Sequence, residues 1–390
     1  MKRMLLALWL FAPAAAAQET SQEDRLKTLE QRLARLEGAP AKTSLSAFNP
    51  AIGMALDSLY RQSDTRGNFQ FRTGEINIEA PIDPFLKAWA VLNGNPEGVE
   101  VEEAAMQTTA LPFNLAVTGG RLFASFGRIA HWHDDSLPTP DRPRSLDTFI
   151  GGETQADGVE VSYLFPTPLY LTATAGAYNK VGGENARADN AVERTLDEFT
   201  YLGRVAAYAD LGADHSLELG ASSAWTPKRA LEEDITVTGN PAPETTRRNT
   251  WRTLHGADLT YRYHPAAGGL YRGLLWSTEV LQNNERRFAP DTRLPSDRVR
   301  AFAGFSYFWL KLGRHWRPGA LVDLTEDLDD GKRIARTWTA FLTCDVTEFN
   351  RLRLAYSWVR DNDPLTRNNN ILTFQWTAFM GHHVHGFRDR

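Results

Sequence analysis

The chain has 390 residues, a formal net charge of −5, a mean hydropathy of −0.40 and one cysteine, Cys344, and its length fits either one barrel or two soluble domains. The mild acidity excludes a nucleic-acid partner, which needs a basic surface, and the lone cysteine excludes an internal disulfide. After the first residues no apolar run approaches the about eighteen residues of a membrane-spanning helix, which excludes a helical membrane protein.

Residues 1–17 have the organisation of a secretory signal peptide. Lys2 and Arg3 form a positive start, residues 5–11 form a short apolar core, and four alanines end at Ala17. The core is too short to cross about 30 Å of hydrocarbon, so a membrane anchor is the weaker alternative. We expect cleavage after Ala17 and export to the periplasm of a Gram-negative bacterium.

Residues 18–37 are predicted to form a short coiled-coil helix in the periplasm. The seam consists of leucines at spacings of 3, 4 and 3, namely Leu26, Leu29, Leu33 and Leu36. Two heptads do not hold a helix in water, so the seam is expected to bury itself by self-association, as in a homotrimer. The alternative is a frayed, charged arm. Residues 38–48 are predicted to be a linker, with Gly38 ending the helix.

From residue 49 the helical period is replaced by short segments of alternating character. Residues 351–358 and 371–378 alternate polar and apolar side chains, and Gly, Pro, Asn or Asp bound such segments. About sixteen segments follow one another, from near residue 55 to near residue 374. The pattern predicts an all-β fold, in which residues 49–390 form a transmembrane antiparallel β-barrel.

The connections between these segments alternate between short and long. Residues 81–84, 165–168 and 264–268 are short connections, whereas residues 180–198 and 227–250 are long and polar. Neighbouring antiparallel strands place every second connection on the same side, and outer-membrane barrels have tight periplasmic turns and longer outer loops. The alternation therefore favours a cell outer-membrane location, with membrane lipid and the barrel-assembly machinery as partners.

The two faces of the predicted strands differ in chemistry. Aromatic residues such as Trp358 and Trp376 are expected to face lipid near the membrane interfaces. The opposite faces are expected to line a wet lumen, because about sixteen strands enclose a channel. The predicted pore-lining residues are Glu75, Asn77, Glu79, Asp258, Arg262, Arg298, Arg300, Arg351, Arg353 and Gln375. The arginines of the later strands would favour anions, and a wall without selectivity is the alternative.

The longest connection spans residues 124–157 and is predicted to fold inward and narrow the pore. Its charged and imidazole side chains are Arg128, His131, His133, Asp134, Asp135, Arg142 and Arg144. The alternative is an external flap.

Metal and catalytic motifs are sparse. His131 and His133, followed by two aspartates, form a candidate zinc site, although two histidines alone do not complete a tetrahedral set. His382, His383 and His385 form a second histidine cluster. The chain lacks the nucleophile elbow, the HExxH motif, the Walker loop and the dinucleotide fingerprint, so we expect no enzyme and no cofactor other than a possible zinc ion.

Dispersed motifs resemble those of a family of proteobacterial outer-membrane barrels named zinc-regulated TonB-dependent outer membrane receptors. They are NPAI at 49–52, VEVEEA at 99–104, LP at 111–112, GR at 120–121, FG at 126–127, HWH at 131–133, FIGG at 149–152, GV at 158–159 and GHHVHGF at 381–387. The layout is also similar to that of the phosphate-selective porins, which implies a coiled coil ahead of a trimeric sixteen-stranded barrel. TonB-dependent receptors hold a plug inside about twenty-two strands. Strands here begin by residue 50, so we expect a porin-like barrel instead.

Three functional hypotheses follow. The first is a passive outer-membrane channel for small hydrophilic solutes or ions. The second is an outer-membrane receptor or channel for zinc or another metal, free or chelated. The third is a soluble secreted β-protein that binds or cleaves carbohydrate.

Overall fold

The computed structural model describes residues 50–64, 66–183, 193–235, 244–288, 295–328, 333–362 and 368–381. The predicted signal peptide, coiled-coil helix (Leu26, Leu29, Leu33 and Leu36) and linker lie outside the described residues, as does the cluster of His382, His383 and His385. These predictions stay predictions.

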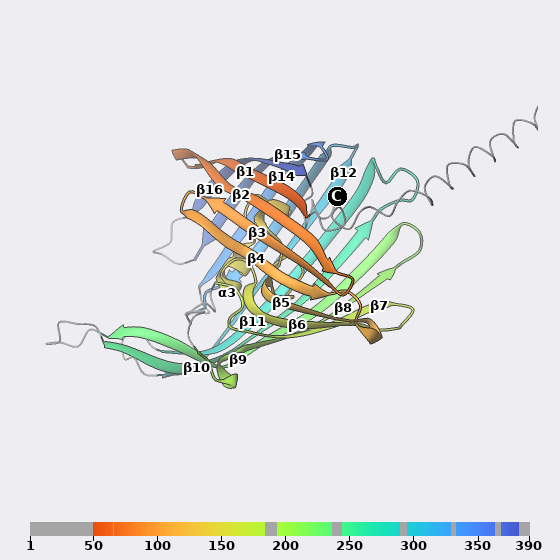
Figure 1. The fold of residues 1–390 in the computed structure, drawn as a ribbon. Coiled ribbons are helices and arrows are strands. Elements are labelled where there is room, and N and C mark those ends of the chain that lie inside the picture. Colours follow the sequence, from red (N-terminus) through yellow and green to blue (C-terminus); the bar gives the residue numbers. More distant parts are fainter. Residues whose placement is uncertain are drawn as a thin grey trace, which may run out of the picture. The chain divides into compact units, whose positions relative to one another are not determined.

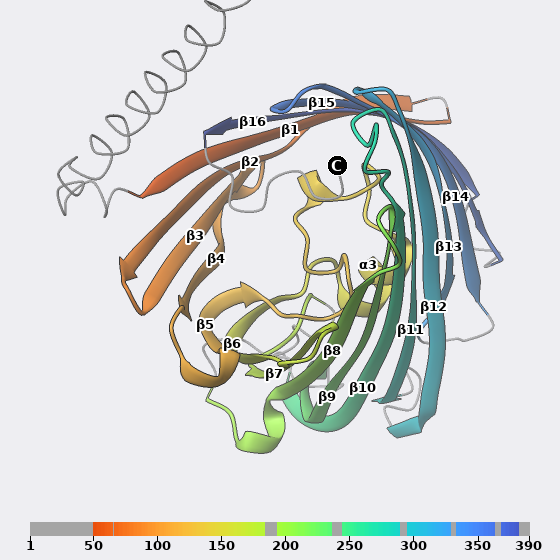
Figure 2. The same cartoon turned by 90° about the vertical axis from the view of Figure 1, so that its right-hand side faces the viewer.

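The described residues form sixteen strands that close into one antiparallel barrel (Figures 1 and 2). The strands are β1 Ala51–Ser63, β2 Arg66–Asp83, β3 Leu86–Asn95, β4 Gly98–Thr108, β5 Leu115–Phe123, β6 Gln155–Leu164, β7 Tyr170–Tyr178, β8 Thr200–Asp210, β9 His215–Ile235, β10 Glu244–Tyr263, β11 Arg272–Phe288, β12 Pro295–Leu312, β13 Trp316–Glu326, β14 Ile334–Thr347, β15 Asn350–Asp361 and β16 Asn369–Gly381. Each strand pairs with its sequence neighbours, and β1 pairs with β16 from Gly53 opposite Gly381 to Ser63 opposite Ile371. Closure leaves no unpaired edge, so every strand can satisfy its backbone groups within the sheet.

Alternation of side chains decides which face of each strand looks outward. In β16, Phe374 and Trp376 are 44% and 53% exposed, whereas Thr373, Gln375 and Thr377 are buried on the other face. Apolar residues outside and polar residues inside are the arrangement of a barrel surrounded by lipid. The predicted outward position of Trp358 and Trp376 is confirmed.

The connections alternate as the sequence predicts, but two of them are shorter than expected. β9 and β10 continue pairing until Ile235 lies opposite Glu244, and β11 and β12 pair from Phe288 opposite Pro295. Figure 1 shows β9 and β10 running past their neighbours. The polar stretch 227–250 is therefore largely strand and not loop, because backbone hydrogen bonds of the ladder do not depend on apolar side chains.

In the part of the chain that the structure describes, helical structure is confined to short segments between strands. The 3-10 segments are η1 Pro112–Asn114, η2 Asp134–Ser136 and η3 Leu196–Glu198, and the α-helix is α3 Arg144–Ile150. No helix within the described residues is long and apolar enough to cross a membrane.

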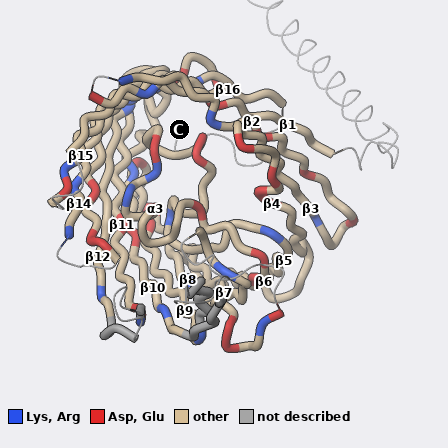
Figure 3. The backbone as a smooth tube through the Cα atoms, turned by 90° about the vertical axis from the view of Figure 1, so that its left-hand side faces the viewer, with Lys and Arg blue, Asp and Glu red and all other residues tan. Residues whose placement is uncertain are grey.

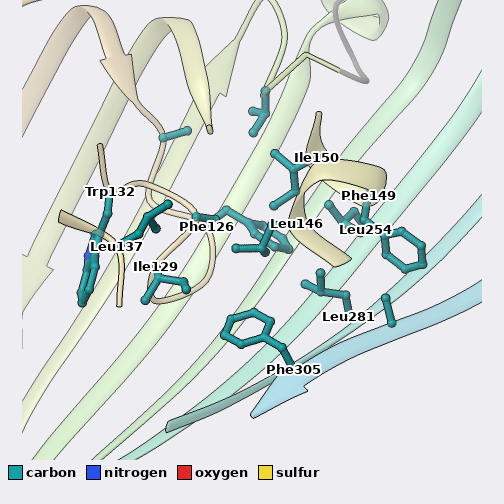
Figure 4. Packing of buried hydrophobic residues seen from close by; sticks show 14 of the residues in the cluster. Phe126, Ile129, Trp132, Leu137, Leu146, Phe149, Ile150, Leu254, Leu281 and Phe305 are labelled. Atoms are coloured by element: carbon teal, nitrogen blue, oxygen red, sulfur yellow. The ribbon is translucent and has the colours of Figure 1, made fainter. Parts of the chain in front are cut away.

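The hydrophobic core lies inside the barrel, between the connection that follows β5 and the inner faces of the later strands (Figure 4). The connection contributes Phe126, Ile129, Trp132, Leu137, Leu146, Phe149 and Ile150. The wall contributes Leu254, Leu275, Leu281, Phe305, Tyr307, Trp309, Leu321 and Phe341. The part of the lumen wall that faces this connection is therefore partly apolar, which the sequence pattern alone did not indicate.

The inward apolar residues of β12 contradict the prediction that its arginines face the lumen. Ala301, Phe305 and Tyr307 are buried inside, whereas Phe302 and Arg300 are exposed on the outer face. The prediction that Arg300 lines the pore was wrong, because the apolar residues that alternate with it on β12 pack inside against the inward connection. The side chain of Arg298 lies outside the described residues.

Candidate functional site

The connection between β5 and β6, residues 124–154, folds back into the barrel, where Figure 2 shows it with α3 inside the ring of strands. Its two ends are joined, since Ala124 N–H donates to the Thr154 carbonyl at 2.9 Å and the Thr154 hydroxyl donates to the Ala124 carbonyl at 2.8 Å. Gly151 ends α3 with a φ of 84°, a left-handed conformation that glycine adopts without strain. We call residues 124–154 the lumen loop.

Buried polar groups of the wall hold the lumen loop in one position. Asp323 of β13 accepts hydrogen bonds from the Ser145 backbone at 3.0 Å and from the Ser145 hydroxyl at 2.6 Å. Arg128 donates to the Tyr307 hydroxyl at 2.6 Å, and its backbone N–H donates to Glu279 at 3.1 Å. Apolar packing alone does not fix the orientation of the loop. These hydrogen bonds do, because hydrogen bonds to charged groups are short and orientation-dependent.

Arg142 ties the lumen loop to itself. Its buried guanidinium donates to the carbonyls of Ile129, Ala130 and Trp132, at 3.3, 3.3 and 2.7 Å. It also pairs with Asp134 at 3.0 Å and Glu153 at 3.1 Å. One side chain thereby satisfies three buried carbonyls and links both limbs of the loop.

The arginines of the later strands lie behind the lumen loop. Arg353 donates to the Leu137 carbonyl at 2.8 Å, and Arg351 and Arg317 pair with Asp345 at 2.9 and 2.7 Å. The cavity beside them has a volume of only about 20 Å³ and is also lined by Trp132, Pro138, Trp309 and Phe341. Arg351 and Arg353 therefore face inward, but Arg353 binds the loop, Arg351 pairs with the wall residue Asp345, and neither borders the larger opening.

The larger opening lies between the lumen loop and strands β1 to β4, and we call it the passage. Its volume is about 520 Å³. Its charged lining consists of the acidic residues Glu75, Glu100, Glu102, Asp134, Asp141, Asp147 and Glu153 and the basic residues Arg61, Arg72 and Arg142. Figure 3 shows the acidic positions of β2 and β4. Among the described residues that line the passage, seven acids thus outnumber three bases.

Several of these charges are already paired. Arg72 pairs with Asp57, which also accepts hydrogen bonds from Gln375 at 3.0 Å and from Thr377 at 2.7 Å. Arg61 pairs with Asp141 of the lumen loop. The basic groups of the passage are therefore engaged, which leaves the acids to set the local potential.

The most buried charged group of the passage surrounds His133. Its Nδ1 lies 3.3 Å from Glu102 Oε2 and 3.7 Å from Glu75 Oε2, and its Nε2 lies 3.0 Å from Glu103 Oε1. Burial lowers the pKa of His133, but the surrounding carboxylates outweigh it and raise the pKa well above the usual value. The carboxylates around His133 therefore favour its protonated form when no other cation is bound.

The structure brings together only some of the predicted site residues. Asn77 lies on the inner face near Glu75, and Asp135 is buried in the lumen loop. Further along the wall, Glu79 pairs with Lys87, Asp258 with Arg204 and Arg262 with Glu218. The convergent group of metal-ligating side chains among the described residues consists of Glu75, Glu102 and His133 and does not include His131. Zinc binding by His131 together with His133 stays a prediction.

Sequence reasoning missed Asp57, Glu102, Glu103 and Arg72. A β-bulge explains the two glutamates, since Val91 pairs with Glu103 and Leu92 pairs with Val101, which leaves Glu102 as an extra residue. Both carboxylates then lie inside the barrel, against strict alternation. Consecutive glutamates in an otherwise alternating strand were the signal that could have located the bulge.

Comparison with known proteins supports the fold class. No family model matches the chain. An uncharacterized protein of Aquifex aeolicus (strain VF5) is 27% identical over 347 residues, which are 83% of this chain and 70% of that protein.

Solved outer-membrane proteins share the architecture at low identity. A loop L8 deletion mutant of OmpT of Vibrio cholerae superposes with a TM-score of 0.57 at 11% identity, over 86% of this chain and 100% of that chain. An anion-selective porin from Comamonas acidovorans gives 0.57 at 12%, over 85% and 99%. The outer membrane channel DcaP of Acinetobacter baumannii gives 0.54 at 8%, over 85% and 96%. The fold is therefore the sixteen-stranded barrel of outer-membrane porins.

Replacing Arg142 by Ala should loosen the lumen loop. The Trp132 carbonyl, Asp134 and Glu153 lose the guanidinium donor, whereas the Ile129 and Ala130 carbonyls keep their backbone donors, and each lost charged hydrogen bond costs about 1.5–3 kcal/mol. We expect amide hydrogen exchange of residues 124–154 to accelerate at least about ten-fold, which corresponds to about 1.4 kcal/mol.

Arg144→Ala is the matched control, because the Arg144 side chain is 40% exposed and its ion pair, with Asp361 of β15, does not hold the buried carbonyls of the loop. Its effect on exchange should stay below about two-fold, as for exposed ion pairs. Equal acceleration in both variants, or none in Arg142→Ala, would show that Arg142 does not hold the loop.

Proposed function

We propose that this protein is an outer-membrane channel through which small hydrophilic solutes diffuse passively, with a preference for cations and without a chemical step. The observation that carries the proposal is the passage of about 520 Å³ between the lumen loop and β1 to β4, together with its acidic lining. A wide barrel narrowed by an inward loop restricts solutes by size, and fixed charges at the narrow part select them by sign.

Cation preference follows from the position of the charges. The arginines that sequence reasoning linked to anions, Arg351 and Arg353, lie behind the lumen loop, whereas Glu100, Asp141 and Asp147 border the passage. A unit charge about 4 Å away changes the energy of an ion by about 1 kcal/mol even in water. Because seven carboxylates face three guanidinium groups, the lining keeps an excess of negative charge that concentrates cations within the passage.

An outer-membrane location is supported by the apolar outer surface. Its exposed aromatic residues include Phe308, Trp276, Tyr356 and Trp376. Exposure of so many large apolar side chains in water would drive aggregation, which argues against the soluble carbohydrate-binding alternative. Insertion of such a barrel requires the barrel-assembly machinery as a partner in the cell.

Self-association is part of the proposal. One of the structural neighbours, OmpT of Vibrio cholerae, is described in a trimer form, with a TM-score of 0.54. In this chain the leucine seam of residues 18–37 would add contacts between copies in the periplasm, after cleavage of residues 1–17 and ahead of the linker 38–48.

A metal-uptake channel is the second candidate, and the group around His133 favours it. The receptor name that accompanies the resembling family has no support among the comparisons, whose named neighbours are porins and channels. A passive channel that concentrates cations would pass metal ions without an energised receptor.

Planar-bilayer recording tests the proposed function. Purified full-length protein should give stepwise conductance, and a potassium chloride gradient should give a reversal potential of cation-selective sign. Glu100→Gln combined with Asp141→Asn should lower the ratio of cation to anion permeability by roughly five-fold or more, because two charges are removed and Arg61 loses its partner.

Asp210→Asn, in an exposed position at the turn end of β8, is the control and should leave the ratio unchanged. Absence of conductance steps would refute the channel, and anion selectivity would refute the role of the acidic lining.

Selectivity should also depend on pH through Asp147. Restricted hydration inside the barrel raises the pKa of Asp147 to about 7, Arg142 lowers it, and Asp134, Asp141 and Asp323 raise it further. The carboxyl is neutral below this pKa and charged above it, so the preference for cations should increase between pH 6 and pH 8. Asp147→Asn should remove this increase, and an identical pH profile in the variant would contradict the assignment.

A further inference from the structure

Three metal-ligating side chains converge at the wall of the passage. The ligand atoms of Glu75 on β2, Glu102 on β4 and His133 on the lumen loop lie within 4.8 Å of one another, and all three residues are buried. Bonds of about 2.0–2.2 Å in a tetrahedral zinc site place ligand atoms about 3.4 Å apart. Small side-chain rotations bring these three groups to that spacing.

The β-bulge in β4 places Glu102 among the three metal-ligating side chains. Regular alternation would direct only one of Glu102 and Glu103 into the barrel, but the extra residue at Glu102 turns both inward. Glu102 then faces His133 Nδ1, and Glu103 faces His133 Nε2. The two carboxylates can thus take two different roles toward one imidazole.

Glu103 has the position of a group that orients a metal-binding histidine. Its Oε1 lies 3.0 Å from His133 Nε2, and its Oε2 accepts a hydrogen bond from the Trp89 indole. A carboxylate that binds one ring nitrogen fixes the ring and leaves the other nitrogen to the metal. Here the other nitrogen, Nδ1, is the one that faces Glu75 and Glu102.

Each carboxylate of Glu75 and Glu102 has one oxygen atom without a hydrogen-bond donor. Glu75 Oε2 and Glu102 Oε2 are buried and accept no hydrogen bond. His133 is the cationic group that contacts both carboxylates, whereas Arg142 pairs with Asp134 and Glu153 and Arg72 pairs with Asp57. Buried carboxylates without donors are costly, and a bound cation removes that cost.

We propose that Glu75, Glu102 and His133 bind a divalent transition-metal ion of the zinc class at the constriction, with Glu103 as the residue that positions His133. One nitrogen and two carboxylate oxygens suit zinc, whereas calcium and magnesium prefer sets made of oxygen alone. Glu75 and Glu102 also line the passage, so an ion could reach the three ligands from it.

A bound ion would regulate the passage. It would connect the lumen loop to β2 and β4 through His133, and it would neutralise part of the acidic lining. Cation conductance should therefore fall when the ion binds. This consequence depends on the proposed channel function, whereas metal binding itself does not.

The test is isothermal titration of the full-length protein in detergent with zinc chloride, together with cobalt absorption spectra. We expect one site per chain and intense visible bands typical of tetrahedral cobalt. Glu102→Gln, which keeps the shape of the side chain, should weaken zinc binding at least about 100-fold, and Glu103→Gln should weaken it about 10- to 100-fold.

Two controls separate this site from other ligands. Glu97→Gln changes an exposed acid in the β3–β4 turn, outside the passage lining, and should bind zinc like the unmodified protein. Replacing His382, His383 and His385 by Ala should also leave the site intact. His133→Gln is the second test variant, and the shift between unheated and boiled samples on a denaturing gel verifies that each variant folds.

Equal zinc affinity in the unmodified protein, Glu102→Gln and His133→Gln would overturn the proposal, as would the absence of binding. Conductance should be recorded in the same preparations with and without zinc. Zinc binding without any conductance steps would refute the channel and keep the metal site. Normal conductance without zinc binding would refute the metal site and keep the channel.

Discussion

The seating of the lumen loop against the inner wall is the interaction on which the rest of the structure depends. Phe126, Leu146 and Phe149 of the loop pack against Leu281 and Phe305 of the wall. Each large side chain that becomes fully buried contributes about 1.5–3 kcal/mol. Asp323, Glu279 and Arg353 add hydrogen bonds that fix the orientation of the loop. Inside a barrel this wide, only such a filling converts a water-filled cylinder into a narrow passage.

The asymmetry of the lumen follows from that seating. The loop covers the apolar and basic half of the wall, so the open half is the one formed by β1 to β4 with its carboxylates. The same loop carries His133 across to Glu75 and Glu102, and Arg142 keeps the two limbs of the loop together. The negative charge of the passage and the geometry of its metal-ligating group both follow from the position of the lumen loop.

The sequence was sufficient for the number, order and direction of the strands. Period-two alternation and the short turns located all sixteen, and the length of residues 124–157 marked the loop. It was insufficient for β12, where the apolar stripe from Ala301 to Trp309 fits lipid and the lumen loop equally well. Alternation shows that two faces differ, but a barrel with an internal apolar filling has apolar residues on both sides.

The site was harder to predict than the fold, because it depends on contacts between residues that are far apart in the sequence. His133 was identified from its neighbour His131, yet its partners come from β2 and β4, and one of them depends on a bulge that shifts the register by one residue. Contacts between a loop and distant strands have no local sequence pattern. Charge counts along the chain also gave no answer on ion preference, since Arg351 and Arg353 lie behind the loop while the acids line the passage.

The position of the lumen loop can be measured directly by cross-linking in outer membranes. In a chain in which Cys344 is replaced by Ser, cysteines are introduced at Ser145 and Asp323, whose side-chain oxygens lie 2.6 Å apart. A short bis-methanethiosulfonate should join the two cysteines within one chain in nearly every molecule, as read by mass spectrometry of the linked peptides. Independent labelling of Ser145→Cys by a bulky external thiol reagent, without cross-linking, would place the loop outside the barrel and contradict the account.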